Sequence, residues 1–420
     1  MVFCFLWQSR GLAQPEDISD LFARQKSGLF IIEVADQASD NKNVIGSGFL
    51  LNEHGLIATN YHVVSSQTLY PEKYHLKYKD SDDNTGPLSV VAVDVINDLA
   101  LVQMQQPEAI DFSRLWQFEL AESLPEQGAE VVAMGNPYDI GISVVPGTYN
   151  GRLKKSYRQN IHFTGALNPG MSGGPAVNKQ GQVIGVNVSG AGNSVSFLVP
   201  VTYLQALLDK VKTAAQADET QLKEQLSTEL KTYQDELLDD LLAGDWTLSE
   251  FGPLKVPTAV RGYVDCSGQT TPADSDQYYD GHSSECGVND YIFLSQRLGT
   301  GLLEWDYGWY VSDQLNQIQF YQMFEEVYFV AANQAGGDDV TGFQCVEDIT
   351  QIASLPDTAF KSVYCVRSYL DYAGLYDVLY FAKSLLDRSE GIYLHYTLAG
   401  VTMTKAKAFN QRFLEALAWK

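Results

Sequence analysis

The segment around Ser172 has the composition of a nucleophile held in a glycine-rich loop. Residues 168–175 are Asn-Pro-Gly-Met-Ser-Gly-Gly-Pro, so Gly170 precedes the serine by two positions and Gly173 follows it directly. In acyl transfer a serine hydroxyl attacks a carbonyl carbon while backbone N–H groups hold the developing oxyanion, and glycines leave room for this approach. The pattern predicts that Ser172 is a nucleophile and that the N–H groups of Gly170 and Ser172 bind the oxyanion. Gly-x-Ser-Gly-Gly alone also fits an ordinary hairpin turn.

A histidine and an aspartate upstream occupy places from which they can assist Ser172. Residues 46–51 and 55–64 are two apolar runs typical of strands, joined by a turn, with His62 at the end of the second. Asp98 stands directly before another apolar run, where a carboxylate can be buried against a histidine. The chain order His62, Asp98, Ser172 is that of the trypsin-like arrangement and differs from the orders in subtilisins and α/β-hydrolases.

Four segments resemble the HtrA (DegP, DegS and DegQ) group of trypsin-fold serine proteases. They are GSGFLLNEHGLIATNYHVV, NDLALVQM, VVAMGNPYDIG and GALNPGMSGGPAVNKQGQVIGVNV, and the resemblance covers roughly residues 25 to 210. It implies a serine endopeptidase with His62 as general base, Asp98 as its orienting carboxylate and Ser172 as nucleophile. It also implies that Gly170 and Ser172 are the oxyanion donors. No PDZ domain is recognisable after the resembling region.

The substrate pocket is expected to be apolar. In trypsin-like folds the residue six positions before the nucleophile lies at the base of the primary specificity pocket, and here it is Ala166. Alanine cannot pair with lysine or arginine, so we expect cleavage after small or medium aliphatic residues. This preference resembles that of the HtrA group for sites in unfolded chains. Met171 stands where the group usually has asparagine, and little effect on the chemistry is expected because this position mainly contributes its backbone.

The spacing of apolar runs predicts a mainly β chain. Roughly a dozen short runs, separated by Gly, Asn, Asp and Pro, continue from residue 29 to residue 200. They indicate a trypsin-like double β-barrel, with six antiparallel strands in each barrel and the active site in the crevice between them. The expected order is a leader at 1–24, the protease domain at 25–200, a helical linker at 201–244 and an α+β C-terminal domain of unknown function at 245–420, the tail.

The linker and the tail have weaker patterns. Residues 201–242 contain no proline or glycine and carry leucines at intervals of four and three, which indicates one or two amphipathic helices packed on a neighbouring domain. A partner helix or coiled-coil arm is the alternative, so an oligomer formed through this helix or through the tail is open. In the tail, aromatic residues at strand spacing are more often core than ligand surface. Strands are expected at 291–294, 319–321, 327–331 and 392–396, and helices at 375–386 and 409–417.

Composition and charge exclude some classes of function. The formal net charge is −24 and the pI is near 4.5, so nucleic-acid phosphates would be repelled. No apolar run reaches about 18 residues, and no transmembrane segment is expected. No metal site and no cofactor are expected either. The one basic segment, residues 152–158, is expected to be a solvated hairpin, with a contact for acidic substrates or a regulatory loop as the alternatives.

Four of the five cysteines lie in the tail and form two pairs of equal sequence separation. They suggest local disulfides, Cys266 with Cys286 and Cys345 with Cys365, although four cysteines allow three pairings. A zinc site is the weaker alternative, because no Cys-x-x-Cys pair occurs. Residues 11–15 resemble the end of a signal peptide, which indicates a truncated leader. These features predict a periplasmic or secreted protein of the bacterial envelope.

Three functions are compatible with the sequence. The first is an active endopeptidase whose partners are proteins or peptides and which cleaves unfolded or exposed segments outside the cytoplasm. The second is a pseudoprotease or holdase-type binder in which the three site residues are present but held inactive. In the third, the tail is a binding module with an accessory protease. The protease region is expected to work without the tail, so that a chain ending near Gly244 still cleaves.

Overall fold

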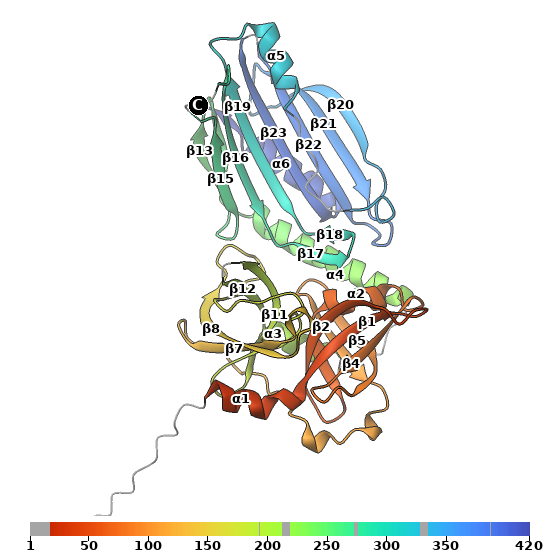
Figure 1. Cartoon of the computed structure of the whole chain (residues 1–420). Helices are drawn as coiled ribbons and strands as arrows, with labels where there is room; N and C mark the ends of the chain where they lie inside the picture. The colour runs from red at the N-terminus through yellow and green to blue at the C-terminus, as the bar shows by residue number, and fades with distance from the viewer. Residues whose placement is uncertain (1–16, 193, 212–218, 273–275, 328–334, 387) are drawn as a thin grey trace, which may run out of the picture.

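The computed structural model shows two barrels, a helical layer and a large sheet (Figure 1). The predicted leader at 1–24 lies largely outside the described residues, and helix α1 (Ile18–Gln25) forms its described end. The structure describes residues 17–192, 194–211, 219–272, 276–327, 335–386 and 388–420.

The first barrel closes in the strand order β1-β2-β3-β6-β5-β4. Its strands form where the sequence alternates apolar residues with turn residues, and the interior is filled by Phe30, Ile32, Leu50 and Ile57, none more than 1% exposed. The elements are β1 (Leu29–Asp36), β2 (Lys42–Leu50), β3 (Leu56–Thr59), α2 (Tyr61–Leu69), β4 (Tyr74–Lys79), β5 (Thr85–Asp94) and β6 (Leu99–Met104). Three-residue 3-10 helices lie at Lys26–Gly28, Pro107–Ala109 and Phe112–Arg114.

The second barrel closes in the order β10-β11-β12-β9-β8-β7, so the prediction of two six-stranded antiparallel barrels is confirmed. Its interior contains Val131, Ile161, Phe163 and Ile184, all fully buried. The strands are β7 (Glu130–Gly135), β8 (Ser143–Arg152), β9 (Ile161–Phe163), β10 (Pro175–Val177), β11 (Val183–Gly192) and β12 (Val195–Pro200), with a 3-10 helix at Pro137–Asp139.

Two helices follow the barrels, α3 (Val201–Val211) and α4 (Glu219–Leu242). Helix α4 lies between the barrels and the large sheet (Figure 1). Its leucine stripe is buried within the chain: Leu226 and Leu230 join the core of the first barrel, whereas Leu237 and Leu241 join the core of the tail. This burial favours packing inside one chain over a coiled-coil arm, because the stripe is already covered.

The tail is built on a seven-stranded antiparallel sheet in the order β15-β16-β19-β23-β22-β21-β20. Helices α4 and α6 pack with it around an aromatic core that includes Trp305, Tyr396 and Phe409. The sheet strands are β15 (Asp265–Thr270), β16 (Asp280–Val288), β19 (Leu303–Val311), β20 (Gln344–Gln351), β21 (Ala359–Ser368), β22 (Tyr376–Leu385) and β23 (Glu390–Val401). The other elements are β13 (Thr247–Phe251), β14 (Leu254–Ala259), β17 (Ile292–Ser295), β18 (Leu298–Thr300), α5 (Gln317–Glu325), α6 (Met403–Glu415) and β24 (Ala418–Trp419).

Two element predictions in the tail are wrong. The helix predicted at 375–386 is instead strand β22 (Tyr376–Leu385), because Val378, Tyr380 and Ala382 are buried on alternate positions, although the leucines of this segment fit helical spacing. Residues 319–321 belong to helix α5, which begins at a capping box formed by Asn316 and Gln319. The strands expected at 291–294 and 392–396 and the helix at 409–417 are present as β17, β23 and α6, and the strand expected at 327–331 lies almost entirely outside the described residues.

Both expected disulfides are present, and they occupy equivalent places at the two edges of the large sheet. Cys266 on β15 lies directly opposite Cys286 on β16, and Cys345 on β20 lies directly opposite Cys365 on β21. Strands β15 and β20 are the two outermost strands in the order of this sheet. Each outermost strand is therefore covalently joined to its inner neighbour.

Candidate active site

His62 lies on helix α2 and not at the end of a strand, as the sequence pattern had predicted. Strand β3 ends at Thr59, and His62 is the second residue of α2. Asn60 stands at the N-cap position, but its side chain makes no capping bond; its Nδ2 group instead donates to the carbonyl oxygen of Asp98 at 2.7 Å. The start of α2 is therefore attached to the turn that carries Asp98.

Asp98 holds both the backbone and the ring of His62. It lies in the turn between β5 and β6 with a φ of +55°, in the left-handed region that aspartate enters more readily than most residues. Its Oδ1 accepts the backbone N–H of His62 at 2.8 Å, and its Oδ2 lies 2.6 Å from Nδ1 of the ring. With the Nδ1 proton directed at the carboxylate, Nε2 is left as the proton acceptor of the imidazole.

The pKa of His62 is raised above its ordinary value. Burial of the ring lowers this pKa, because it disfavours the charged imidazolium, but the charge and the hydrogen bond of Asp98 together outweigh that effect. The imidazolium is therefore stabilised. This is the form that a general base adopts once it has taken a proton.

Ser172 lies in a loop in which two positions, 170 and 173, can only be occupied by glycine. Gly170 has a φ of +95°, and a Cβ there would lie 2.3 Å from the carbonyl oxygen of Asn136. Gly173 has a φ of +86°, and its Cβ would lie 2.2 Å from the carbonyl oxygen of Ser47. The Oγ of Ser172 donates to the carbonyl oxygen of Val188 at 3.2 Å. Among the described residues, no hydrogen bond joins this hydroxyl to the imidazole of His62.

The two expected oxyanion donors are available. Among the described residues, neither the N–H of Gly170 nor the N–H of Ser172 donates a hydrogen bond within the chain. By contrast, the neighbouring N–H of Met171 donates to the carbonyl oxygen of Asn168 at 3.0 Å, and that of Gly173 donates to the carbonyl oxygen of Asn187 at 2.9 Å. Two free donors on either side of a turn are what an oxyanion hole requires.

Two residues that the sequence had not indicated support the loop. Ser47 on β2 donates from Oγ to the carbonyl oxygen of Gly170 at 2.7 Å, and its backbone N–H donates to the carbonyl oxygen of Ser172 at 2.8 Å. Asn187 on β11 donates from Nδ2 to the carbonyl oxygen of Met171 at 3.3 Å. A small hydroxyl residue between Gly46 and Gly48 is the signal that could have identified Ser47. The Met171 side chain is fully buried, so this departure from the family pattern lies in the interior.

A cavity of about 380 Å³ lies beside His62 and Ser172. Ala166, the predicted pocket residue, is exposed and is not part of the lining, whereas its neighbour Leu167 is. His62 is the one titratable side chain in the lining. The lining residues are Ile45, His62, Leu167, Asn168, Pro169, Gly170, Ser172, Asn187, Val188 and Gly190.

The described residues contain no group of three or more His, Cys, Asp and Glu side chains arranged to hold a metal ion. Nor does this part of the chain include a helix with the length and apolarity needed to cross a membrane.

Comparisons with known proteins concern the barrel region. Residues 46–186 match the family described as trypsin-like peptidase domain. Among curated relatives, serine protease HTRA3 of Homo sapiens is 29% identical over 48% of this chain and 45% of its own length. Serine protease HTRA1 of Xenopus laevis is 34% identical over 37% of this chain and 33% of its own length. A probable periplasmic serine endoprotease DegP-like protein of Chlamydia trachomatis is 30% identical over 40% of this chain and 34% of its own length.

The match therefore spans less than half the length of each of these relatives. A solved structure of a serine endoprotease from Yersinia pestis aligns with 47% of this chain and 67% of that one, at 22% identity and a TM-score of 0.39. The resemblance to HtrA proteases seen in the sequence is confirmed for the barrel region.

Proposed function

We propose, from the trypsin-like peptidase domain that residues 46–186 form, that this chain is a serine endopeptidase acting through His62, Asp98 and Ser172. The observation that carries the proposal is the pairing of His62 Nδ1 with Asp98 Oδ2 at 2.6 Å, beside a cavity that both His62 and Ser172 line. A histidine held in this way presents Nε2 to a serine hydroxyl.

The geometry supports a two-step acyl transfer. Ser172 Oγ turns from the carbonyl oxygen of Val188 toward His62, which takes its proton as Oγ attacks the substrate carbonyl carbon. The N–H groups of Gly170 and Ser172 stabilise the oxyanion, and His62 then gives the proton to the leaving amine. In the second step His62 takes a proton from a water molecule as the water oxygen attacks the acyl carbonyl carbon. His62 then gives this proton to Ser172 Oγ as the ester bond breaks, which releases the acid product and restores the enzyme.

The lining of the cavity supports an aliphatic preference before the cut. Ile45, Leu167 and Val188 supply apolar groups, and no Asp or Glu in the lining could pair with a basic side chain. In a substrate protein, aliphatic residues are exposed mainly in unfolded or extended segments, because folded proteins bury them. We therefore assign unfolded or exposed protein segments as the substrates.

An extracytoplasmic location is supported by two observations. Disulfides persist in oxidising compartments and are rare in the cytosol, and this chain has two in the tail. The matching Chlamydia trachomatis protein is described as periplasmic. On this basis we propose that the protein lies in the periplasm or is secreted. We also propose three parts of the chain: the protease domain at 25–200, the helical linker at 201–244 and the tail at 245–420.

Cleavage of unfolded casein by the full chain and by Ser172→Ala tests the proposal. The wild type is expected to cleave and to be labelled by a fluorophosphonate at Ser172, whereas Ser172→Ala does neither. A chain that binds casein without cleaving it, and that resists labelling, would instead be the pseudoprotease or holdase-type binder.

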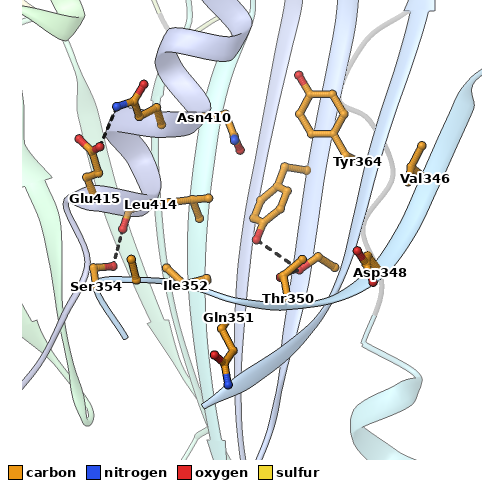
Figure 2. Close-up of a pocket in the computed structure, with 14 residues that line it drawn as sticks. Val346, Asp348, Thr350, Gln351, Ile352, Ser354, Tyr364, Asn410, Leu414 and Glu415 are labelled. Carbon is orange, nitrogen blue, oxygen red and sulfur yellow. Dashed lines mark hydrogen bonds between the residues drawn. The ribbon is translucent and has the colours of Figure 1, made fainter. Parts of the chain in front are cut away.

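Binding by the tail is a second candidate function, and one observation favours it. A cavity of about 790 Å³ lies between β20, β21 and α6 (Figure 2), within the size range of small-molecule sites. Val346, Ile352 and Leu414 line it together with the rings of Tyr364 and Tyr380. Three of the hydroxyl groups in its lining are already bonded, since Thr350 pairs with Ser362 at 2.6 Å and Ser354 donates to the carbonyl oxygen of Leu414 at 2.6 Å. An apolar ligand fits these walls best.

Titration with an apolar fluorescent dye tests this second function. Saturable binding to the wild type is expected, and Leu414→Trp should abolish it by filling the cavity. Leu248→Trp is the control, because Leu248 is 40% exposed on β13 and does not line the cavity. Equal dye binding by all three proteins would contradict a site in this cavity.

A further inference from the structure

The tail contacts the helix that carries His62. The hydroxyl of Tyr61, the residue before His62, donates to the carbonyl oxygen of Leu294 at 2.8 Å, and Tyr61 is fully buried. The ring of Phe293 lies edge-on to the ring of Tyr61, with centroids 6.3 Å apart, and edge-on to the imidazole of His62, with centroids 6.1 Å apart. Leu294 and Phe293 belong to β17, which together with β18 lies at the end of the tail facing the barrels (Figure 1).

A second contact connects the tail to the loop after β8. The carboxylate of Asp290, whose side chain is 6% exposed, accepts hydrogen bonds from Ser156 Oγ at 2.7 Å, from the N–H of Tyr157 at 2.6 Å and from the N–H of Arg158 at 3.2 Å. The basic segment 152–158 is thus not a solvated hairpin at this end, because it packs against an acidic residue of the tail.

Arg158 extends this contact to the turn that carries Asp98. Its guanidinium donates to the carbonyl oxygen of Tyr291 at 2.6 Å and also to the carbonyl oxygen of Ile96. Ile96 lies two residues before Asp98 in the same turn between β5 and β6. One side chain therefore joins the tail to the segment that orients the imidazole.

We infer that residues 290–294 of the tail are a positioning element of the proteolytic site. This inference rests on the proposed function. The segment holds the helix of His62 through Phe293 and Leu294, and it holds the turn of Asp98 through Asp290 and Arg158. Phe293 contacts the imidazole ring and Asp290 contacts the loop after β8, but neither takes part in bond making or proton transfer. Both act by fixing the distance and the orientation between base and carboxylate.

The segment matters for catalysis because the rate depends on the exact placement of His62 relative to Asp98 and Ser172. A displacement of about 1 Å in a reacting group can lower a rate by about a hundredfold. The ring of Phe293 also packs edge-on against the imidazole, and an apolar neighbour in place of water strengthens charge interactions at such a site. Without the tail, the buried hydroxyl of Tyr61 would lose its acceptor and Arg158 would lose two of its partners. We therefore no longer expect a chain that ends near Gly244 to keep full activity.

The test compares Phe293→Ala with Phe343→Ala in the full chain. Phe343 is also an aromatic residue of the tail, but its ring packs on Arg367 and not on the protease. Phe293→Ala is expected to lower kcat by about tenfold to a hundredfold while KM stays near the wild-type value. Fluorophosphonate labelling of Ser172 should slow by a similar factor. Phe293→Leu should restore most of the rate, and Phe343→Ala should behave as the wild type.

Equal kcat and equal labelling rates for Phe293→Ala and Phe343→Ala would overturn the inference. Circular dichroism at the assay temperature checks that each variant is folded. If Phe293→Ala does not fold, Tyr61→Phe decides, because it removes only the hydroxyl that bonds Leu294: a lowered kcat supports the positioning role and an unchanged kcat overturns it. A wild type no more active than Ser172→Ala would instead refute the proposed function.

Discussion

The carboxylate of Asp98 binds His62 twice, once through the imidazole Nδ1 at 2.6 Å and once through the backbone N–H at 2.8 Å. The second bond fixes the start of helix α2, which carries the imidazole ring. One side chain therefore orients both the ring and the backbone of the base.

Replacement of Asp98 by asparagine should separate these two roles. The amide oxygen of Asp98→Asn can still accept the backbone N–H, but its NH₂ group would face Nδ1 and favour the wrong tautomer of the ring. We expect kcat to fall by about 10⁴ with little change in stability. Asp98→Ala should lower both kcat and the melting temperature, because it also releases the start of α2. Peptide hydrolysis and thermal unfolding measure the two effects; an active Asp98→Asn enzyme would exclude this role for Asp98.

The pH dependence of the reaction should follow His62. A general base must be neutral, and Asp98 raises the pKa of His62 above its ordinary value of 6.5. The value of kcat/KM should therefore rise with pH, as the proton is lost, and reach half its maximum above pH 6.5. His75→Gln is the control, since His75 has its own carboxylate partner, Asp40, at 3.0 Å on the surface. A midpoint that moved in His75→Gln would assign the titration to another group.

The oxyanion loop can be tested with two glycines of nearly equal backbone geometry. Gly170 has a φ of +95° and Gly128 a φ of +96°, but only at Gly170 would a Cβ meet another atom, at 2.3 Å. Gly170→Ala should displace one oxyanion donor and lower kcat by about 10² to 10³. Gly128→Ala should cost about 1–2 kcal/mol of stability from the left-handed backbone and leave kcat unchanged. Equal kcat in both variants would show that the N–H of residue 170 does not stabilise the oxyanion.

Specificity is expected to depend on Leu167 more than on Ala166. Profiling with a peptide library should find aliphatic residues before the cut and no preference for Lys or Arg. Leu167→Ala should enlarge the cavity and shift the preference toward larger side chains, whereas Ala166→Ser should change little, because Ala166 is exposed outside the lining. The reverse result would place the pocket floor at Ala166, as the count from the nucleophile predicts.

The sequence predicted the barrels better than the tail, where both disulfides but only some of the elements were as expected. Barrel strands have regular apolar runs, and the chemistry around Ser172 requires glycines whose positions are visible in the sequence. The helix predicted at 375–386 followed the helical spacing of its leucines, whereas strand β22 buries a different set, Val378, Tyr380 and Ala382, on alternate positions. The contact of Phe293 with His62 could not be predicted, since it joins residues more than 200 positions apart and depends on how the tail docks.

Reduction of the disulfides should loosen the tail before it affects the barrels. Each disulfide closes a loop with a sequence separation of 20, which corresponds to about 3 kcal/mol in the chain-entropy estimate. Mass spectrometry of the unreduced chain should find Cys266 joined to Cys286 and Cys345 joined to Cys365. Hydrogen exchange after reduction should rise first in β15 and β20. Free thiols at all four positions would contradict both the pairing and the oxidising compartment.

The first barrel has two apolar cores, and each continues into a different neighbour. Ile57 and Tyr61 share one core with Leu226 of α4 and Ile292 of the tail, while Phe49 shares the other with Met134 of the second barrel. A contiguous core is commonly a unit of cooperative unfolding. The first barrel, the second barrel and the tail should therefore unfold in one calorimetric transition. An inhibitor bound at Ser172 should then raise the melting temperature of the tail as well as that of the barrels.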